Sequence, residues 1–431
     1  MALALDIAPA RRSRRRRKGR PVRRFLVVTH RWSSLVLGIV LLAITTSGAL
    51  ILYQGEWAAA TNRSTFHTTP TSDPVSFDDA VAVVDRAHPS FEAAGIHIYN
   101  GLFQVASSDD DKHPGFWGVD PGTGNITGYV NPDGGVMGFL TNLHECALTC
   151  DDYPGYVPFL DMPIPWASVH VIPEVTWGSG GILLIATMLF FLGISGLILW
   201  WPGVKRWTHG FRVRWRKTRF TRDFDLHQLI GFVAAPFLVM WGFTGASFEL
   251  PAMENAWYAL TGGVAKPDSD RDFSSHAAPK GTPDIGLAAA VAAAKAQSPG
   301  TVTSVEGPSE PGRAGSYEVR LSTHPDPRRH GPRPGRVVFA VDRHDATHIE
   351  QTSFAKQETW SNTVWDSWRS GVLHYGYGVN SWWRTIWFVF GMSPLLLAWT
   401  GVSTWLYRCG VAKRKRAAIK ARNEDINEPN D

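Results

Sequence analysis

Four long apolar runs constrain the fold of this 431-residue chain more than any other feature. A helix of about 20 apolar residues is about 30 Å long, which is the thickness of a bilayer's hydrocarbon core. Runs of this kind occupy residues 33–53, 180–201, 229–250 and 385–407. Mean hydropathy over the whole chain is only −0.11, so large polar segments must lie between the runs. The sequence therefore predicts four membrane spans that alternate with segments outside the bilayer.

Basic residues predict the orientation of these spans. Ten of residues 11–24 and eight of residues 205–222 are lysine or arginine, and another basic group follows residue 407. Basic loops stay in the cytoplasm, so we expect both termini inside and residues 62–179 and 251–383 outside. The basic N-terminus could instead bind nucleic acid, and the first run could be a cleaved signal. A basic run beside a span and the length of the apolar run favour a retained span and no nucleic-acid partner.

The chain also repeats itself. In the first span His30 stands before Gly48, and in the third span His227 stands before Gly245 at the same sequence spacing. Each following outer segment has a predicted helix, at 77–87 or 285–296, before several short strands. Val119–Asp120 and Val341–Asp342 stand before corresponding hairpins. An internal duplication of one span pair with one outer α+β unit accounts for this pattern.

The predicted fold class is an α+β membrane protein, in which a four-helix transmembrane bundle carries two extracytoplasmic α+β domains. The expected order of segments is a basic N-terminus 1–28, a span 29–53, an outer domain 62–140, a His/Cys loop 141–179, a span 180–201, a basic loop 202–226, a span 227–250, an outer domain 251–370, an outer histidine segment with a span 371–407, and a tail 408–431.

Three cysteines fall on both sides of the predicted membrane. Cys146 and Cys150 lie in the first outer segment, where an oxidising compartment permits a disulfide between them. Two unpaired thiols or a two-cysteine metal site are the alternatives. Cys409 follows the last span on the inner side.

Four histidines near the span ends suggest a cofactor. His30 and His227 lie at the inner ends of their spans, while His144 and His374 precede spans on the outer side. Histidines near a membrane indicate a function, and two imidazoles from facing helices can bind one haem iron. We therefore predict two b-type haems, one on each face. Hydrogen-bonded interfacial histidines, or a zinc or copper site, are the alternatives. The chain has no Cys-x-x-Cys-His motif, which excludes covalent haem attachment by that motif.

The second outer ligand has a substitute. Spacing to the glycine of the following span favours His170, which stands almost as far before Gly196 as His374 stands before Gly401. The local Leu-His pair favours His144, since Leu143–His144 matches Leu373–His374. We take His144 as the ligand and keep His170 as the substitute.

The chain resembles the PepSY-associated transmembrane proteins, which include iron-regulated membrane proteins and siderophore ferric reductases. The resemblance covers most of residues 24–408 and rests on His30–Arg31–Trp32, Ser47–Gly48–Ala49, Leu143–His144, Ser195–Gly196 with the run to Pro202, Asp225–Leu226–His227, Thr244–Gly245, Leu373–His374 and Thr400–Gly401. It implies PepSY-like outer domains and a place in the bacterial cytoplasmic membrane.

Two functions follow from this resemblance together with the histidines. The first is di-haem electron transfer from a quinol or a cytoplasmic reductase to ferric iron or a ferric siderophore at the outer face. The second is a binding or regulatory role, in which PepSY domains inhibit a peptidase or hold an envelope partner. The sequence has no dinucleotide fingerprint and no nucleophile–base arrangement of a hydrolase, and it identifies no catalytic residue.

Two further outer features are interpreted as surface. Asp109–Asp110–Asp111 forms an exposed acidic run, and His324, His330, His344 and His348 form a loose histidine set that could touch a metal. We interpret the first as a solvated loop and the second as a flexible surface.

Overall fold

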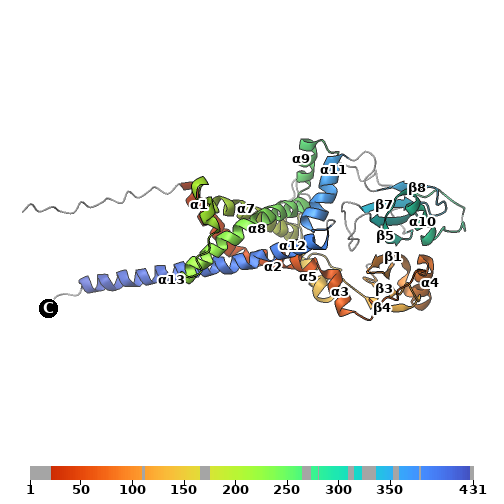
Figure 1. The fold of residues 1–431 in the computed structure, drawn as a ribbon, viewed down its shortest axis with the longest axis horizontal. Helices are drawn as coiled ribbons and strands as arrows, with labels where there is room; N and C mark the ends of the chain where they lie inside the picture. Colours follow the sequence, from red (N-terminus) through yellow and green to blue (C-terminus); the bar gives the residue numbers. More distant parts are fainter. Residues whose placement is uncertain are drawn as a thin grey trace, which may run out of the picture.

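A computed structural model describes residues 21–108, 112–165, 175–264, 273–279, 281–308, 315–322, 336–352, 359–377 and 380–427. Figure 1 shows an elongated molecule with long helices toward one end and a β-sheet with its covering helices at the other. Short helices lie between these two parts.

Long apolar helices form the first part. Within the described ranges, three stretches are long and apolar enough to cross a membrane: α7 (Trp177–Trp200), α8 (Arg219–Glu249), and Ser381–Ile419, which contains α12 (Ser381–Gly391) and most of α13 (Ser393–Asn427). The pair α1 (Pro21–Val36) and α2 (Gly38–Ile51) gives a fourth candidate. The protein is therefore a multi-pass membrane protein.

The first candidate span differs from the expected continuous helix. Its two halves are bent by 69° at Leu37, which leaves helical geometry with φ −98° and ψ 1°. Gly38 follows directly, and glycine is a poor helix former. The predicted run at 33–53 thus crosses a break between two helices.

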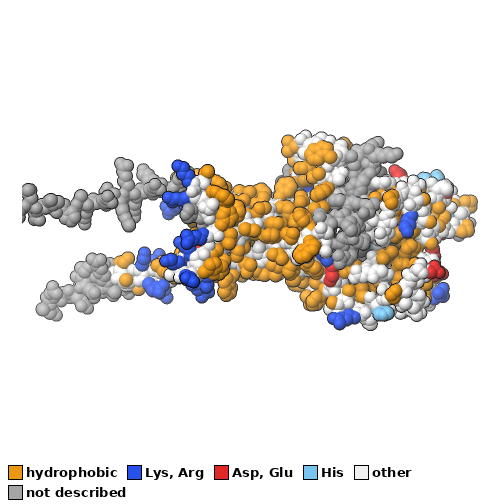
Figure 2. Space-filling view, viewed as in Figure 1, with side chains coloured by type: hydrophobic (Ala, Val, Ile, Leu, Met, Phe, Trp, Pro, Cys, Tyr) orange, Lys and Arg blue, Asp and Glu red, His pale blue; other side chains and the backbone are white. Residues whose placement is uncertain are grey.

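The face of the long helices that Figure 2 shows is largely apolar. Hydrophobic side chains form a continuous band over them in Figure 2, and lysine and arginine gather at the end away from the sheet. Inside the band, α2, α7 and α8 meet through a small buried core that includes Leu41, Met188 and Leu238. A helix that is apolar both inside and outside is typical of a membrane span.

Eight antiparallel strands form one sheet in the order β4-β3-β2-β1-β5-β6-β7-β8. The strands are β1 (Ala93–Tyr99), β2 (Leu102–Ser107), β3 (Phe116–Val119), β4 (Ile126–Val130), β5 (Thr301–Glu306), β6 (Tyr317–Ser322), β7 (Arg336–Val341) and β8 (Ile349–Gln351). The sequence predicts a small sheet in each outer segment. The structure joins them because β1 pairs with β5, opposing Ile96 to Val305, which removes two strand edges that would otherwise be unpaired.

Two helices pack on this sheet and close a shared core. These are α4 (Phe77–Ala87) and α10 (Leu287–Gln297), and both contribute to one buried cluster with strands of both segments. Asp78 in α4 accepts hydrogen bonds from the backbone N–H groups of Leu287 and Ala288, 2.7 and 2.9 Å away. A carboxylate at a helix N-terminus satisfies unpaired donors, so the first sheet-forming segment stabilises the helix of the second.

Shorter helices include α3 (Gln54–Thr61), η1 (Pro89–Phe91), α5 (Gly135–Glu145), α6 (Pro158–Asp161), η2 (Val204–Phe211), α9 (Pro251–Thr261), α11 (Trp360–Thr363) and the π-helix η4 (Val364–His374). They lie between the long helices and the strands along the chain, except η2, which lies between α7 and α8, and η1, which lies between α4 and β1. Two of them, α5 and η4, end beside the histidines His144 and His374 and bring these side chains against α2 and α8.

Candidate functional site

His144 lies in the last turn of α5 and packs its ring onto α2. Its Nδ1 lies 2.7 Å from the backbone carbonyl oxygen of Ile44. A Cβ added at Gly48 would lie within 2.7 Å of three ring atoms, so only glycine leaves room for the ring. A carbonyl oxygen can only accept a hydrogen bond, so Nδ1 carries the proton and Nε2 keeps its lone pair.

His374 ends η4 and packs onto α8 in a similar way. Its Nδ1 lies 2.9 Å from the Thr244 hydroxyl, which donates its own proton to the carbonyl of Met240 at 2.9 Å. That hydroxyl therefore accepts from Nδ1–H, and Nε2 again keeps its lone pair. A Cβ at Gly245 would lie 3.7 Å from the ring.

The rings of His144 and His374 lie next to each other. Their centres are 6.1 Å apart, and their planes are inclined by 34°. A metal–imidazole bond is about 2 Å long, so two rings that share one metal ion have centres about 6 Å apart. The observed separation fits one metal ion, such as a haem iron, between them.

His30, in α1, repeats this arrangement at the other end of the helices. Its Nδ1 lies 2.8 Å from the Ser195 hydroxyl in α7. That hydroxyl is also 3.3 Å from the carbonyl of Leu192, to which it donates. A Cβ at Gly196 would lie 3.6 Å from the ring.

His227, in α8, packs onto α13. Its Nδ1 lies 3.1 Å from the carbonyl oxygen of Leu397 and 3.0 Å from the Thr400 hydroxyl. A Cβ at Gly401 would lie 3.4 Å from the ring.

All four histidines share one environment. Each Nδ1 is held by an acceptor on a neighbouring helix, each ring lies beside a glycine, and each side chain is only partly buried. Among the described residues, none of the four uses Nε2 in a hydrogen bond. An imidazole fixed through Nδ1 with Nε2 free is the usual form of a histidine metal ligand.

Burial favours the neutral form of His144 and His374. They belong to segments between the candidate spans, and burial lowers the pKa of His374 to about 3, with the nearby His144 and Arg369 adding to the effect. Burial also lowers the pKa of His144, against the opposing effect of its hydrogen bond with Ile44. Metal ions bind the neutral form of imidazole.

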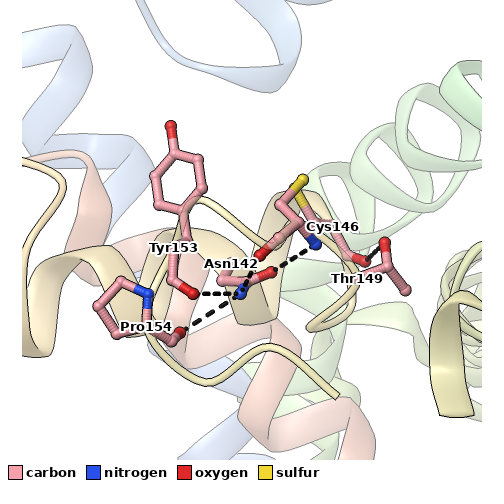
Figure 3. Close-up of a disulfide and its surroundings, with 6 residues drawn as sticks. Asn142, Cys146, Thr149, Tyr153 and Pro154 are labelled. Carbon is pink, nitrogen blue, oxygen red and sulfur yellow. Dashed lines mark hydrogen bonds between the residues drawn. A yellow bond between two sulfur atoms is a disulfide. The ribbon is translucent and has the colours of Figure 1, made fainter. Parts of the chain in front are cut away.

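A disulfide supports the end of α5. A disulfide joins Cys146, the residue that follows α5, to Cys150. Figure 3 shows Cys146 and this bond near Asn142. The fully buried Asn142 holds the loop, since its side-chain nitrogen donates to the carbonyls of Cys150, Tyr153 and Pro154 at 2.9, 3.3 and 3.3 Å. The loop therefore fixes the helix turn that carries His144.

Other residues singled out in the sequence have different places. His170 lies outside the described residues, as do Asp109–Asp111, His324 and His330. Cys409 is exposed on α13 and has a free thiol. His344 and His348 lie in the turn between β7 and β8.

The hydroxyl partners of the histidines were not predicted from the sequence. Ser195, Thr244 and Thr400 each precede the glycine that the ring contacts. The sequence signal for these partners is a Ser/Thr–Gly pair that recurs in the spans. The pair provides an acceptor and an open surface from adjacent positions of one helix.

The fold and the histidine geometry define a multi-pass membrane protein whose sheet is joined to histidine-bearing helices. The chain matches the sequence profile of PepSY_TM, the PepSY-associated TM region, over residues 27–408. The chain belongs to this family, which confirms the resemblance seen in the sequence. Comparison with curated proteins finds no match.

Proposed function

We propose that this protein carries electrons across the membrane through two b-type haems. His144 and His374 hold the outer one, and His30 and His227 hold the inner one. The observation that carries the proposal is the shared environment of the four histidines, each with Nδ1 occupied and Nε2 available. A haem at each place supplies one-electron transfer.

The surrounding residues would prepare each histidine for this role. The hydroxyls and carbonyls that accept from Nδ1–H fix the tautomer and the direction of the ring, and such partners raise the basicity of a ligand. The glycines let the rings lie flat against the helices. The helices themselves keep water away, and low solvent access is one of the means by which a protein sets a haem potential.

The proposed direction is outward. Lysine and arginine gather at the end of the helices that carries His30 and His227, which supports a cytoplasmic location for that end and for both termini. His144 and His374 lie toward the sheet, which would then be extracytoplasmic. We infer that a quinol or a cytoplasmic reductase supplies electrons to the inner pair.

The proposed acceptor is a ferric siderophore, or ferric iron itself, at the outer face of the bacterial cytoplasmic membrane. One electron converts Fe³⁺ to Fe²⁺, which oxygen ligands of a siderophore hold less tightly. Membership of the PepSY-associated family, together with the resemblance to siderophore ferric reductases, supports this acceptor.

We also infer that the molecule is an internal duplication built around a four-helix bundle. Among the described residues, two α-helices, α3 and α4, and four strands follow the first candidate span, and two α-helices, α9 and α10, and four strands follow the third. The histidine contacts repeat as well, because α1 contacts α7 through His30 and α8 contacts α13 through His227.

An absorption spectrum tests the proposal. The full-length protein, expressed with ample haem and purified in detergent, should show a Soret band and two haems per chain. Dithionite should first reduce the two haems. A ferric siderophore that is then added should reoxidise both haems. A protein that takes up no haem contradicts the proposal and favours the binding role of the outer sheet.

Single substitutions test the ligands. His374→Ala and His144→Ala should each remove about half of the haem, and His170→Ala should remove none. The control is His88→Ala, because His88 stacks on Trp117 in the outer sheet at 3.7 Å between ring centres and should leave the spectrum unchanged. Loss of haem in the His170 variant, with none in the His144 variant, would reassign the outer ligand.

A further inference from the structure

A second group of histidines lies at the outer end of the sheet. His276, Asp342 and His348 each offer one ligand atom, and these atoms all lie within 4.8 Å of one another. Asp342 directly follows β7, and His348 directly precedes β8. Figure 2 shows histidine side chains exposed at this end of the molecule, where Figure 1 labels β8.

One carboxylate oxygen is the centre of the group. Oδ2 of Asp342 lies 3.0 Å from Nδ1 of His276 and 2.9 Å from Nδ1 of His348. The two rings are stacked with centres 4.0 Å apart. Metal–ligand bonds of about 2 Å put neighbouring ligand atoms about 3 Å apart, so both distances between the carboxylate oxygen and an imidazole nitrogen already have the spacing of ligands around one ion.

Burial differs among the three residues in a way that suits a metal site. The Asp342 side chain is fully buried, the His348 side chain is 35% exposed, and the His276 side chain is 67% exposed. The carboxylate is thus fixed inside the turn, while the imidazoles face solvent. Such a site can be reached from outside, and it leaves coordination positions open for water or another ligand.

The corresponding turn in the first outer segment shows that the rings are not needed for folding. Asp120 follows β3 as Asp342 follows β7, and its backbone N–H donates to Asn125 at 2.9 Å as that of Asp342 donates to His348 at 2.9 Å. Asp120 also accepts from the backbone N–H of Thr69 at 2.8 Å. Thr69 and Asn125 therefore stand where the second segment has its two histidines.

The shared part of the two turns is a set of backbone hydrogen bonds. Asp342 accepts from the N–H groups of His276, His344 and Asp345 at 2.7, 2.8 and 3.2 Å. These bonds use backbone donors, which any residue except proline provides. The side chains of His276 and His348 are additions to a turn that is already complete without them.

We propose that His276, Asp342 and His348 bind a divalent first-row transition-metal ion at the outer face. Two imidazole nitrogens and one carboxylate oxygen suit Zn²⁺ and Fe²⁺, whereas Mg²⁺ and Ca²⁺ prefer all-oxygen sites. The site is separate from the proposed haem ligands and does not depend on them. It was not predicted from the sequence because His276 stands far before Asp342 in the chain, and because His348 was grouped with other histidines.

Titration of the full-length protein with Co²⁺ and then Zn²⁺ tests this site. The protein is purified in detergent without a histidine tag and stripped with a chelator. Wild type should bind one Co²⁺ that gives visible d–d absorption, and Zn²⁺ should displace it. The double variant His276→Thr, His348→Asn carries the residues of the first segment and should lose this ion, with at least a hundredfold weaker binding.

His344→Ala is the matched control. His344 lies in the same turn, but its Nδ1 is 3.0 Å from the carbonyl oxygen of Pro283 instead of Asp342. This variant should bind Co²⁺ as wild type does. Equal binding by wild type and the double variant would overturn the proposal and leave two rings that only donate hydrogen bonds to Asp342. The haem spectrum should be the same in all three proteins, which separates this result from the haem proposal.

Discussion

Histidines occur in two different environments in this molecule, one among the helices and one at the sheet end. In the helices, the acceptors for Nδ1–H are hydroxyls and carbonyls of a neighbouring helix, as with Thr244 and Ile44. At the sheet end, both Nδ1 atoms face the carboxylate of Asp342. The first arrangement leaves Nε2 without a hydrogen bond among the described residues, whereas the second gathers both Nδ1 atoms and a negative oxygen at one point. The hydrogen-bond acceptor of Nδ1 therefore determines which nitrogen of the imidazole is available to a metal ion.

The largest effect should come from the glycine beneath His144. Gly48→Ala places a methyl group within 2.7 Å of three ring atoms, so the ring must leave its position. We expect loss of the outer haem, measured as about half of the haem content by the pyridine haemochrome spectrum. Gly38→Ala is the matched control on the same helix, because a Cβ there meets nothing within 4 Å. Full haem content in the Gly48 variant would show that His144 is not held there as a ligand.

The next effect should be the gain of a metal ion. Thr69→His with Asn125→His places two imidazoles beside Asp120, at the positions that correspond to His276 and His348. We expect a second Co²⁺ per chain in the same titration, with weaker binding than at the natural site because the neighbouring side chains differ. An unchanged stoichiometry would mean that the two turns are less alike than their hydrogen bonds suggest.

Several features used in this comparison were predicted from the sequence. Apolar length located three candidate spans and a bent fourth. The repeated histidine–glycine spacing singled out His30 and His227, whose role as ligands stays a prediction. Short-range patterns indicated the strands of both segments. These features depend on local residue order, which hydrophobic periodicity records directly.

The remaining features depend on contacts between distant residues. The pairing of β1 with β5 joins strands that lie far apart in the chain, and neither strand carries a pattern that names its partner. The approach of His276 to Asp342 likewise depends on how a loop crosses the sheet. The bend at Leu37 is a local conformational change inside a run that is uniformly apolar, so hydropathy gives no sign of it.

A moderate effect on the free energy of unfolding is expected at Asp120, whose carboxylate only accepts hydrogen bonds at its turn. Burial by itself would raise its pKa, but hydrogen bonds from Thr69, Gly122 and Thr123 lower it to about 2. The ordinary value is 3.8, so the ionised carboxylate stabilises the fold fully above that pH, and this contribution is lost as the pH falls toward 2.

Asp120→Ala should lower the free energy of unfolding at neutral pH by about 2 kcal/mol. Thermal unfolding of the full-length protein, followed by fluorescence, should show a decrease of several degrees. The difference in unfolding free energy between wild type and the Asp120 variant should decrease as the pH falls from 4 to 2. Asp151→Ala, at an exposed position, is the control and should unfold as wild type does. A pH-independent difference would contradict the role of the carboxylate charge.

The smallest effect should come from the hydroxyl that orients His374. Thr244→Val keeps the shape of the side chain but cannot accept from Nδ1–H, so the ring loses the partner that raises its basicity. A less basic ligand stabilises ferric iron less, and the outer haem should therefore remain bound with a higher midpoint potential. A tenfold change in the binding ratio of the two oxidation states corresponds to about 59 mV for one electron.

A spectroscopic redox titration measures this shift, and Thr404→Val is the control because that hydroxyl donates only to the Gly401 carbonyl of its own helix. If both variants have the wild-type midpoint potential, the Thr244 hydroxyl does not tune the haem and only donates its hydrogen bond within the helix. The four histidines would then share a position beside a helix but not an effect of their hydrogen-bond partners on the potential.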